Sequence, residues 1–251
     1  MATTSKSDGT PVRGILKTSK SNHDQIDLKS KKVRKLPAWM QKGKAKGQGN
    51  SRITFPILKI PSTCQIIYSH NENDCNSICS DFLDSINAKT YIGFDIEWPV
   101  KYLCEKEPST AVIQICDDPM RRCFVFHISC IGFLPTSLKK LIERNDIIKV
   151  GLNVQGDLYK LCRDFDICYP KSGVLELGDF ANKVTRSSEK WSLARLVTFL
   201  FGQELPKIDD IRKGDWTSYP LSSAQLEYAA LDAIASLMVY QEIEKRARQI
   251  E

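Results

Sequence analysis

The sequence predicts a mixed α/β fold in which helices cover both faces of one sheet. Two observations support this prediction. Short apolar segments with strand character come first in the apolar part of the chain, and strands then alternate with segments of helical spacing. A chain of 251 residues, 42% of them hydrophobic, is also large enough for one domain with a substantial core. We predict that this domain spans residues 56–251 and that residues 1–55 form a tail.

Each predicted strand is a short apolar run bounded by polar or turn residues. The predicted strands are 64–69, 91–98, 111–116, 123–127 and 147–150. In the second of them, side chains alternate between two faces. Asp95 and Glu97 share one face, whereas Phe94, Ile96 and Trp98 point the other way, where core residues are expected.

Helical periodicity predicts five helices, at 71–86, 136–145, 156–165, 191–201 and 222–248. The fourth ends at Gly202, which is typical of a helix stop. One face of the last helix is apolar, and its residues are Leu226, Ala230, Ala233, Leu237 and Met238. We expect this long helix to pack against the sheet.

The tail is basic and has few large apolar residues, so we predict that it is disordered. Residues 1–50 carry a net charge of +9, whereas the whole chain is +6, so residues 51–251 total −3. A basic run in the tail resembles a nuclear localisation signal and predicts a nuclear protein; its residues are Lys29, Lys31, Lys32, Arg34 and Lys35. A solvated basic run without a targeting role is the alternative.

The cysteine pattern and the absence of long apolar segments favour an intracellular protein that does not interact with membranes. Nine cysteines are scattered without a CxxC pair, which is typical of reduced thiols rather than of a disulfide or zinc framework. No segment approaches the roughly 20 apolar residues of a membrane span. The N-terminus has no apolar region typical of a secretory signal.

Two carboxylates two positions apart on one strand face lie roughly 6–7 Å apart. Burial of Asp95 and Glu97 together would be unfavourable because of desolvation and mutual repulsion. A divalent cation with oxygen ligands, such as Mg²⁺ or Mn²⁺, would relieve that repulsion. The alternative is a solvated strand face with two ordinary acids, but the strand is otherwise apolar.

Two further motifs carry acids. Tyr228 and Asp232 are four positions apart in the last predicted helix and therefore share one face, although Tyr228 alone is typical of a core tyrosine. Asp157 follows a short strand and lies near a helix start, where acids are common for capping reasons alone. The order and spacing of these motifs are more specific than any one of them.

The motifs resemble those of the DEDD exonucleases of the DEDDy subtype: FDIE at 94–97, GLNVQGD at 151–157 and Tyr-x-x-x-Asp at 228–232. The segments 94–99, 112–116, 163–167, 191–193 and 216–221 further resemble the Werner syndrome-type exonucleases, over about residues 90–243. This resemblance implies a ribonuclease H-like fold. It also implies metal-dependent 3′→5′ removal of nucleotides from DNA 3′ ends, in DNA repair or replication.

The resemblance also implies roles for the motif residues and two divalent ions, Mg²⁺ or Mn²⁺, as cofactors. Asp95, Glu97 and Asp232 would bind the first ion. Asp95 would bridge to a second ion, which Asp157 holds through water. Tyr228 would orient the attacking water, since an unperturbed phenol titrates near 10 and is a poor base at neutral pH.

Several residues outside the acidic motifs are candidate substrate contacts. Arg212, Lys213 and Trp216 combine cations with an aromatic ring before the last helix, a mixture that favours single-stranded nucleic acid, although a solvated loop with a buried Trp is an equal alternative. The other candidates lie next to the acids: Ile96, Trp98 and Tyr159. Tyr159 could stack on a base or simply pack its helix.

Two other functions remain open at this point. A ribonuclease D-like exoribonuclease would share the fold and the metals, so RNA is not excluded as a substrate. A non-catalytic nucleic-acid-binding scaffold is the alternative from another class, although such a protein has no need for clustered acids. Since the chain ends at Glu251, we expect a stand-alone exonuclease that works with a separate helicase.

Overall fold

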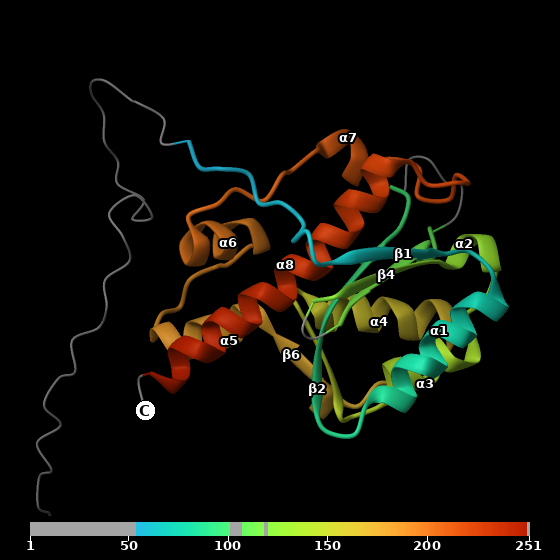
Figure 1. Cartoon of the computed structure of the whole chain (residues 1–251), viewed down its shortest axis with the longest axis horizontal. Coiled ribbons are helices and arrows are strands. Elements are labelled where there is room, and N and C mark those ends of the chain that lie inside the picture. The colour runs from blue at the N-terminus through green and yellow to red at the C-terminus, as the bar shows by residue number, and fades with distance from the viewer. Residues whose placement is uncertain (1–53, 101–106, 118–119, 250–251) are drawn as a thin grey trace, which may run out of the picture. The chain divides into compact units, whose positions relative to one another are not determined.

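The computed structural model describes residues 54–100, 107–117 and 120–249. In this part of the chain, six strands form one sheet in the order β1-β4-β3-β2-β5-β6 (Figure 1). The strands are β1 (Gln65–Ser69), β2 (Thr90–Glu97), β3 (Val112–Cys116), β4 (Arg122–His127), β5 (Ile147–Gly151) and β6 (Val174–Glu176). β3 runs antiparallel to β2 and β4, and the other neighbouring strands are parallel. The prediction of a mixed sheet is confirmed.

Helices cover both faces of this sheet, as predicted. The helices are α1 (Glu72–Ser85), α2 (Ile128–Ile131), α3 (Thr136–Glu143), α4 (Val154–Phe165), α5 (Leu177–Thr185), α6 (Leu193–Phe201), α7 (Asp209–Arg212) and α8 (Ser223–Arg248). One buried apolar cluster joins the sheet to α5, α6 and α8, and a second joins it to α1, α3 and α4. Figure 1 shows α8 running across the sheet.

Strand β2 lies in the middle of the sheet and separates its residues between the two clusters. Phe94 and Ile96 are buried in the cluster of α1, α3 and α4, while Asp95 and Glu97 face α8. The expectation that Trp98 is a core residue is wrong, because Trp98 is 37% exposed. The strand ends at Glu97, so its alternation no longer determines the direction of the next side chain.

Helix α8 is more deeply buried than its predicted apolar face indicates, because it packs against the sheet and also against α5, α6 and α7. The buried residues include alanines throughout the middle of the helix, at 229, 230, 233 and 235. A capping box at Ser222 and Gln225 fixes the start of the helix, each side chain accepting a backbone N–H of the other residue.

Small residues bring α8 into direct contact with β2. A Cβ atom at Gly93 would lie 2.0 Å from the carbonyl oxygen of Ala233, which is closer than any real contact. Only glycine therefore allows the strand and the helix backbone to approach this closely. The contact lies beside Asp95 on the strand and beside Asp232 on the helix, so it sets the spacing of these two acids.

Three α-helices (α2, α5 and α7), the strand β6 and a short 3-10 helix at Lys171–Gly173 were not predicted. α2 and α7 have four residues each and β6 has three, too few for a periodic pattern to appear. The predicted 191–201 helix begins at Leu193, because the Ser192 side chain accepts the Arg195 N–H and caps the helix.

Other expectations are tested in part by the described residues. Every described cysteine is a free thiol. No helix among these residues has the length and apolar character needed to span a membrane. The predicted disordered tail lies outside the described residues except for its last positions, and its basic run at 29–35 lies wholly outside them.

Candidate active site

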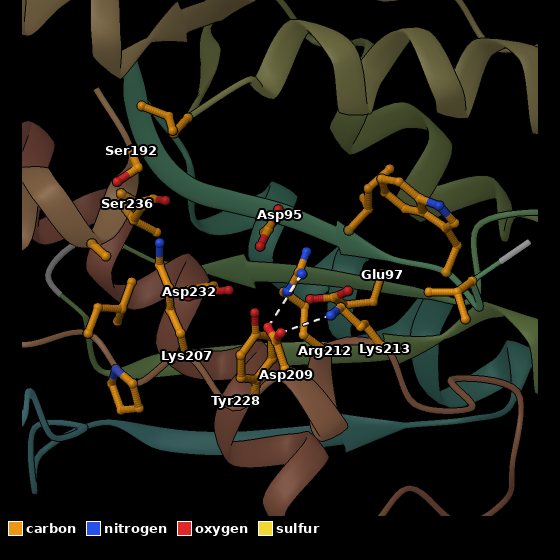
Figure 2. Close-up of a pocket in the computed structure, with 18 residues that line it drawn as sticks. Asp95, Glu97, Ser192, Lys207, Asp209, Arg212, Lys213, Tyr228, Asp232 and Ser236 are labelled. Carbon is orange, nitrogen blue, oxygen red and sulfur yellow. Dashed lines mark hydrogen bonds and ion pairs between the residues drawn. The ribbon is translucent and has the colours of Figure 1, made fainter. Parts of the chain in front are cut away.

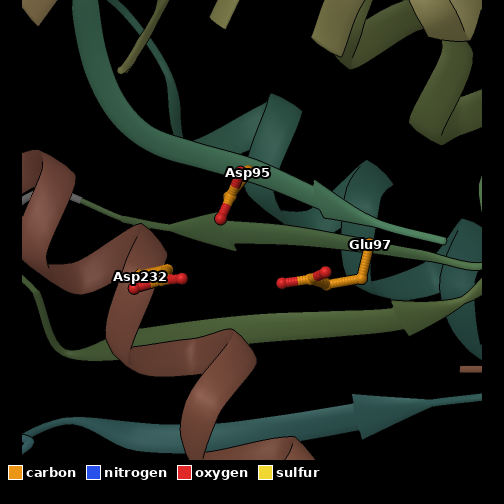
Figure 3. A group of neighbouring side chains, drawn as sticks. All are labelled: Asp95, Glu97 and Asp232. Atoms are coloured by element: carbon orange, nitrogen blue, oxygen red, sulfur yellow. The ribbon is translucent and has the colours of Figure 1, made fainter. Parts of the chain in front are cut away.

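Strand β2 and helix α8 bring three carboxylates together (Figure 3). One oxygen from each of Asp95, Glu97 and Asp232 lies within 4.8 Å of the others. The strand alternation places Asp95 and Glu97 on the face that α8 covers, and α8 adds Asp232 from above that face. Three carboxylates at this spacing match the oxygen ligands that a hard divalent cation prefers.

The electrostatics of these acids disfavour their ionised forms when no cation is bound. Burial raises the pKa of Asp95 and of Glu97 well above the ordinary range, and neighbouring carboxylates raise both further. Burial also raises the pKa of Asp232 to about 7, although the hydrogen bond from Tyr228 and the charges of Lys207 and Arg212 oppose that rise. A bound divalent ion would favour the ionised forms, so the site fits a metal ion.

Asp157 lies in the first turn of α4 and is 6% exposed. It is outside the group of three, yet its charge contributes to the raised pKa of both Asp95 and Glu97. Burial, followed by the charge of Glu176, raises the pKa of Asp157 to about 7. This placement is compatible with a ligand of a second, neighbouring ion.

The loop before α4 explains how Asp157 is held. Asn153 has a left-handed conformation with φ 65°, and its backbone N–H donates to the Glu176 carboxylate at 2.7 Å. Glu176 ends β6 and is half-buried beside the acids. Its participation was not predicted, because it depends on the three-residue strand β6 pairing at the edge of the sheet.

Tyr228 lies one turn before Asp232 on α8, as the sequence predicted. Its hydroxyl hydrogen-bonds to Asp232, and burial raises its pKa above the ordinary phenol value. A phenol with a raised pKa keeps its proton and acts as a donor rather than as a base. The geometry therefore suits an orienting group.

A cavity of about 650 Å³ opens above the acids. The acids Asp95, Glu97 and Asp232 line this cavity together with a cationic rim of Lys207, Arg212 and Lys213. Figure 2 shows Lys207 beside Asp232, and Arg212 and Lys213 beside Asp209 and Glu97. Arg212 and Lys213 both pair with the Asp209 carboxylate, at 3.5 and 2.8 Å. Carboxylates that can hold a metal ion and cations that line the same cavity suit a phosphodiester, because the phosphate is an anion that attracts both the metal ion and the cations.

The predicted substrate contacts are only partly at this cavity. Arg212 and Lys213 line it, but Arg212 ends helix α7, so the expectation of a loop there is wrong. Trp98 lines it too, with the ammonium of Lys160 5.0 Å from its ring centroid. Ile96 also borders the cavity but is 3% exposed, which leaves its side chain in the core.

Two aromatic predictions have different outcomes. Trp216 is completely buried, its indole N–H donates to the Arg212 carbonyl at 3.2 Å, and its ring lies 6.2 Å from that of Tyr228. Trp216 is therefore not free to contact nucleic acid, and the alternative of a buried Trp agrees with the structure; its side chain supports α7 and Tyr228. Tyr159 is 70% exposed on α4 and is not among the residues that line the cavity.

Sequence reasoning missed Lys207 and Asp209. The charge of Lys207 lowers the pKa of Asp232, and Asp209 holds the two rim cations. The run KIDDIRK at 207–213 places two adjacent acids between cations and was the available signal. Only the fold places this run over acids that lie far away in the sequence.

Comparisons with known proteins show the family of the chain. A family described as 3′-5′ exonuclease matches residues 71–248. The chain is 35% identical over 219 residues to the bifunctional 3′-5′ exonuclease/ATP-dependent helicase WRN of Mus musculus, covering 84% of this chain and 15% of that protein. It is 35% identical over 193 residues to a 3′-5′ exonuclease of Arabidopsis thaliana, covering 74% of this chain and 65% of that one.

Solved structures share the fold at lower identity. The EXO domain of Aedes aegypti Nibbler superimposes with a TM-score of 0.64 at 22% identity, over 78% of this chain and 94% of that one. Escherichia coli RNase D, an exoribonuclease involved in structured RNA processing, superimposes with a TM-score of 0.60 at 20% identity, over 74% and 45% of the two chains. At these identities the likeness extends to the fold alone, and the fold is the one that the sequence predicted.

Proposed function

Because the chain belongs to the 3′-5′ exonuclease family, whose members are hydrolases, we propose that it removes nucleotides from the 3′ ends of DNA. The observation that carries this proposal is the group of three carboxylates facing a cationic rim across one cavity. Such a site can bind a phosphodiester and a metal ion at the same time.

Asp95, Glu97 and Asp232 would hold one divalent ion, and Asp95 and Asp157 would share a second. The oxygen-only donor set favours Mg²⁺ or Mn²⁺. Two such ions, when bound, supply a water nucleophile of lowered pKa and stabilise the oxyanion that leaves. The raised pKa values of the acids support this assignment, since binding of cations is what would keep all four ionised at neutral pH.

The chain's own side chains then bind and orient the substrate. Arg212 and Lys213 exchange their pairing with Asp209 for contacts with phosphate oxygens, which hold the strand end over the acids. Tyr228 stays protonated, and its hydroxyl, which hydrogen-bonds to Asp232, would orient the attacking water. The exposed ring of Trp98 offers a face on which a base can stack.

The choice of DNA over RNA rests on the relatives. The segments 94–99, 112–116, 163–167, 191–193 and 216–221 resemble the Werner syndrome-type exonucleases, and this resemblance implies DNA. The likeness to RNase D, at 20% identity, extends to the fold alone. An exoribonuclease related to RNase D is the second candidate, supported by the shared fold. A scaffold without activity is disfavoured, because it would retain unfavourable buried acids without benefit.

The test uses 5′-labelled DNA and RNA oligonucleotides with recessed 3′ ends, incubated with the full chain in Mg²⁺, Mn²⁺ or EDTA. We expect a ladder that shortens from the 3′ end of DNA, needs metal and is absent in the Asp95→Ala/Glu97→Ala variant. A stronger ladder on RNA would transfer the proposal to the exoribonuclease. Binding of both oligonucleotides without any ladder would refute catalysis and would favour a non-catalytic scaffold that binds nucleic acid.

We also propose a nuclear role in DNA repair or replication, with a separate helicase supplying unwound ends. The basic run at 29–35 supports nuclear localisation. Deletion of residues 1–50 should remove a fluorescent fusion from the nucleus while exonuclease activity on the recessed DNA persists. Unchanged nuclear localisation would refute the role of that run. The helicase proposal has its own test: addition of a purified 3′→5′ helicase should extend degradation into duplex DNA that otherwise resists it.

A further inference from the structure

Gln114 in the middle of β3 is completely buried. Neither the nitrogen nor the oxygen of its side-chain amide has a hydrogen-bond partner among the described residues. Leaving a buried polar group unpaired costs about 1–3 kcal/mol. The other four residues of the strand VIQIC are apolar. Stability of the fold therefore does not account for a glutamine at this position.

The register of the sheet places Gln114 beside the acids. β3 runs antiparallel to β2, and Gln114 pairs directly with Asp95. Side chains of directly paired residues lie on the same face, with Cβ atoms about 4.5–5.5 Å apart. Val112 and Cys116, which share the face of Gln114, belong to the cluster under α8. The amide thus lies on the active-site face, within reach of the Asp95 carboxylate.

The chemistry of an amide suits a carboxylate that must hold a metal. The side chain of glutamine offers two N–H donors and carries no charge, whereas an ionised carboxylate has about four lone-pair positions and accepts only. A lysine or arginine here would neutralise Asp95 and compete with the cation. An apolar residue would leave the carboxylate free to rotate. A neutral donor restricts the orientation without changing the charge of the site.

We propose that Gln114 is a positioning residue, whose amide N–H donates to the Asp95 carboxylate when that carboxylate is ionised and holds a divalent ion. The inference rests on the proposed metal-dependent nuclease function. Gln114 would then be one of the residues that hydrogen-bond to a metal ligand without touching the metal. Loss of such a residue typically lowers metal affinity by about 10–100-fold. The unpaired amide therefore destabilises the metal-free protein, and this destabilisation is relieved when metal binding lets the amide donate to Asp95.

The test compares the full-length protein with Gln114→Met, which keeps the length and removes both polar atoms. Three quantities are measured: the melting temperature in EDTA, the Mn²⁺ affinity by titration calorimetry, and kcat and KM on a recessed DNA end. We expect Gln114→Met to melt at an equal or higher temperature in EDTA. Its Mn²⁺ affinity should fall about 10–100-fold, and kcat should fall while KM changes little.

Cys116→Ala is the matched control, because Cys116 is buried on the same face of β3 but pairs with Gly93 instead of an acid. It should lower the melting temperature and leave the Mn²⁺ affinity unchanged. Mn²⁺ affinity and kcat of Gln114→Met equal to those of the wild type would overturn the proposal. So would a melting temperature of Gln114→Met in EDTA well below the wild type, because the amide would then already be paired without metal.

The wild type and Asp95→Asn separate this inference from the function on which it rests. Mn²⁺ binding and cleavage by the wild type, both lost in Asp95→Asn, support the proposed function whatever Gln114→Met does. A wild type that neither binds Mn²⁺ nor cuts DNA or RNA would overturn both the function and the role of Gln114.

Discussion

Replacement of Gly93 by alanine tests whether the contact between β2 and α8 sets the geometry of the site. The added Cβ would lie 2.0 Å from the carbonyl oxygen of Ala233 and 2.9 Å from its carbonyl carbon. Both partners are backbone atoms, so no side-chain rotation can relieve the clash. The helix and the strand must separate by more than about 1 Å to restore an ordinary contact distance of roughly 3.5 Å.

This displacement should affect stability and activity together. Overpacking in a core costs about 1–3 kcal/mol, and we expect at least the upper end because the backbone itself must move. For a chain of this size, about 3 kcal/mol lowers the melting temperature by roughly 6–12 °C. Asp232 would move away from Asp95, and a misplacement of about 1 Å can cost about 100-fold in rate. We therefore expect kcat and Mn²⁺ affinity to fall as well.

The matched control is Gly178→Ala. The nearest atoms to a Cβ there lie at 3.8 and 4.0 Å, which is ordinary contact, and the residue lies in the first turn of helix α5. Alanine should stabilise this helix by about 0.5–1 kcal/mol and leave kcat unchanged. Melting curves and single-turnover assays on both variants decide the question. A Gly93→Ala protein that melts and cuts like the wild type would refute the reasoning.

Three further predictions concern charge. Burial raises the pKa of Asp157 and Asp232 to about 7 from about 4 when unfolded, so the folded apoprotein binds more protons than the unfolded chain between these values. The melting temperature in EDTA should therefore fall as pH rises from about 4 to 7. Mg²⁺ should raise the melting temperature more at pH 8 than at pH 5.5. A melting temperature in EDTA that rises with pH over this range would contradict the prediction. Asp209→Asn releases Arg212 and Lys213 for phosphate, so KM for single-stranded DNA should fall about twofold to fivefold at low salt, and a raised KM would show that Asp209 orders the rim instead. The Lys149 ammonium donates to three backbone carbonyls at 2.7–2.9 Å, those of Ile142, Arg144 and Ile147. Lys149→Met leaves these carbonyls without that donor, so it should lower the free energy of unfolding by about 3 kcal/mol and leave the Mn²⁺ affinity intact. A loss of Mn²⁺ affinity would count against a purely structural role.

Local periodicity made much of this site predictable. The alternation of β2 places Asp95 and Glu97 on one face whatever the rest of the fold does. The four-residue spacing of Tyr228 and Asp232 likewise follows from the helix alone. Most strands and long helices were predicted for the same reason, since each has enough residues to show its period.

The remainder depends on which elements meet in the folded chain. Gln114 acquires its proposed role only because the β2–β3 register pairs it with Asp95. Glu176 approaches Asp157 only because β6 adds to the edge of the sheet beside β5. Trp216 is buried because its segment packs against α7 and α8, and an exposed loop with the same residues would have left the ring free. None of these contacts has a periodic signal in the sequence.

The site is shared between β2 and α8, and this has a consequence for protein synthesis. The ribosome makes Asp95 and Glu97 long before it makes Asp232, so a nascent chain holding the whole sheet still lacks a ligand. Nuclease activity should arise only when α8 has left the exit tunnel and docked. Until then the messenger RNA and nearby nucleic acids face an incomplete enzyme, and a chain truncated by a premature stop codon before α8 should fail to cut.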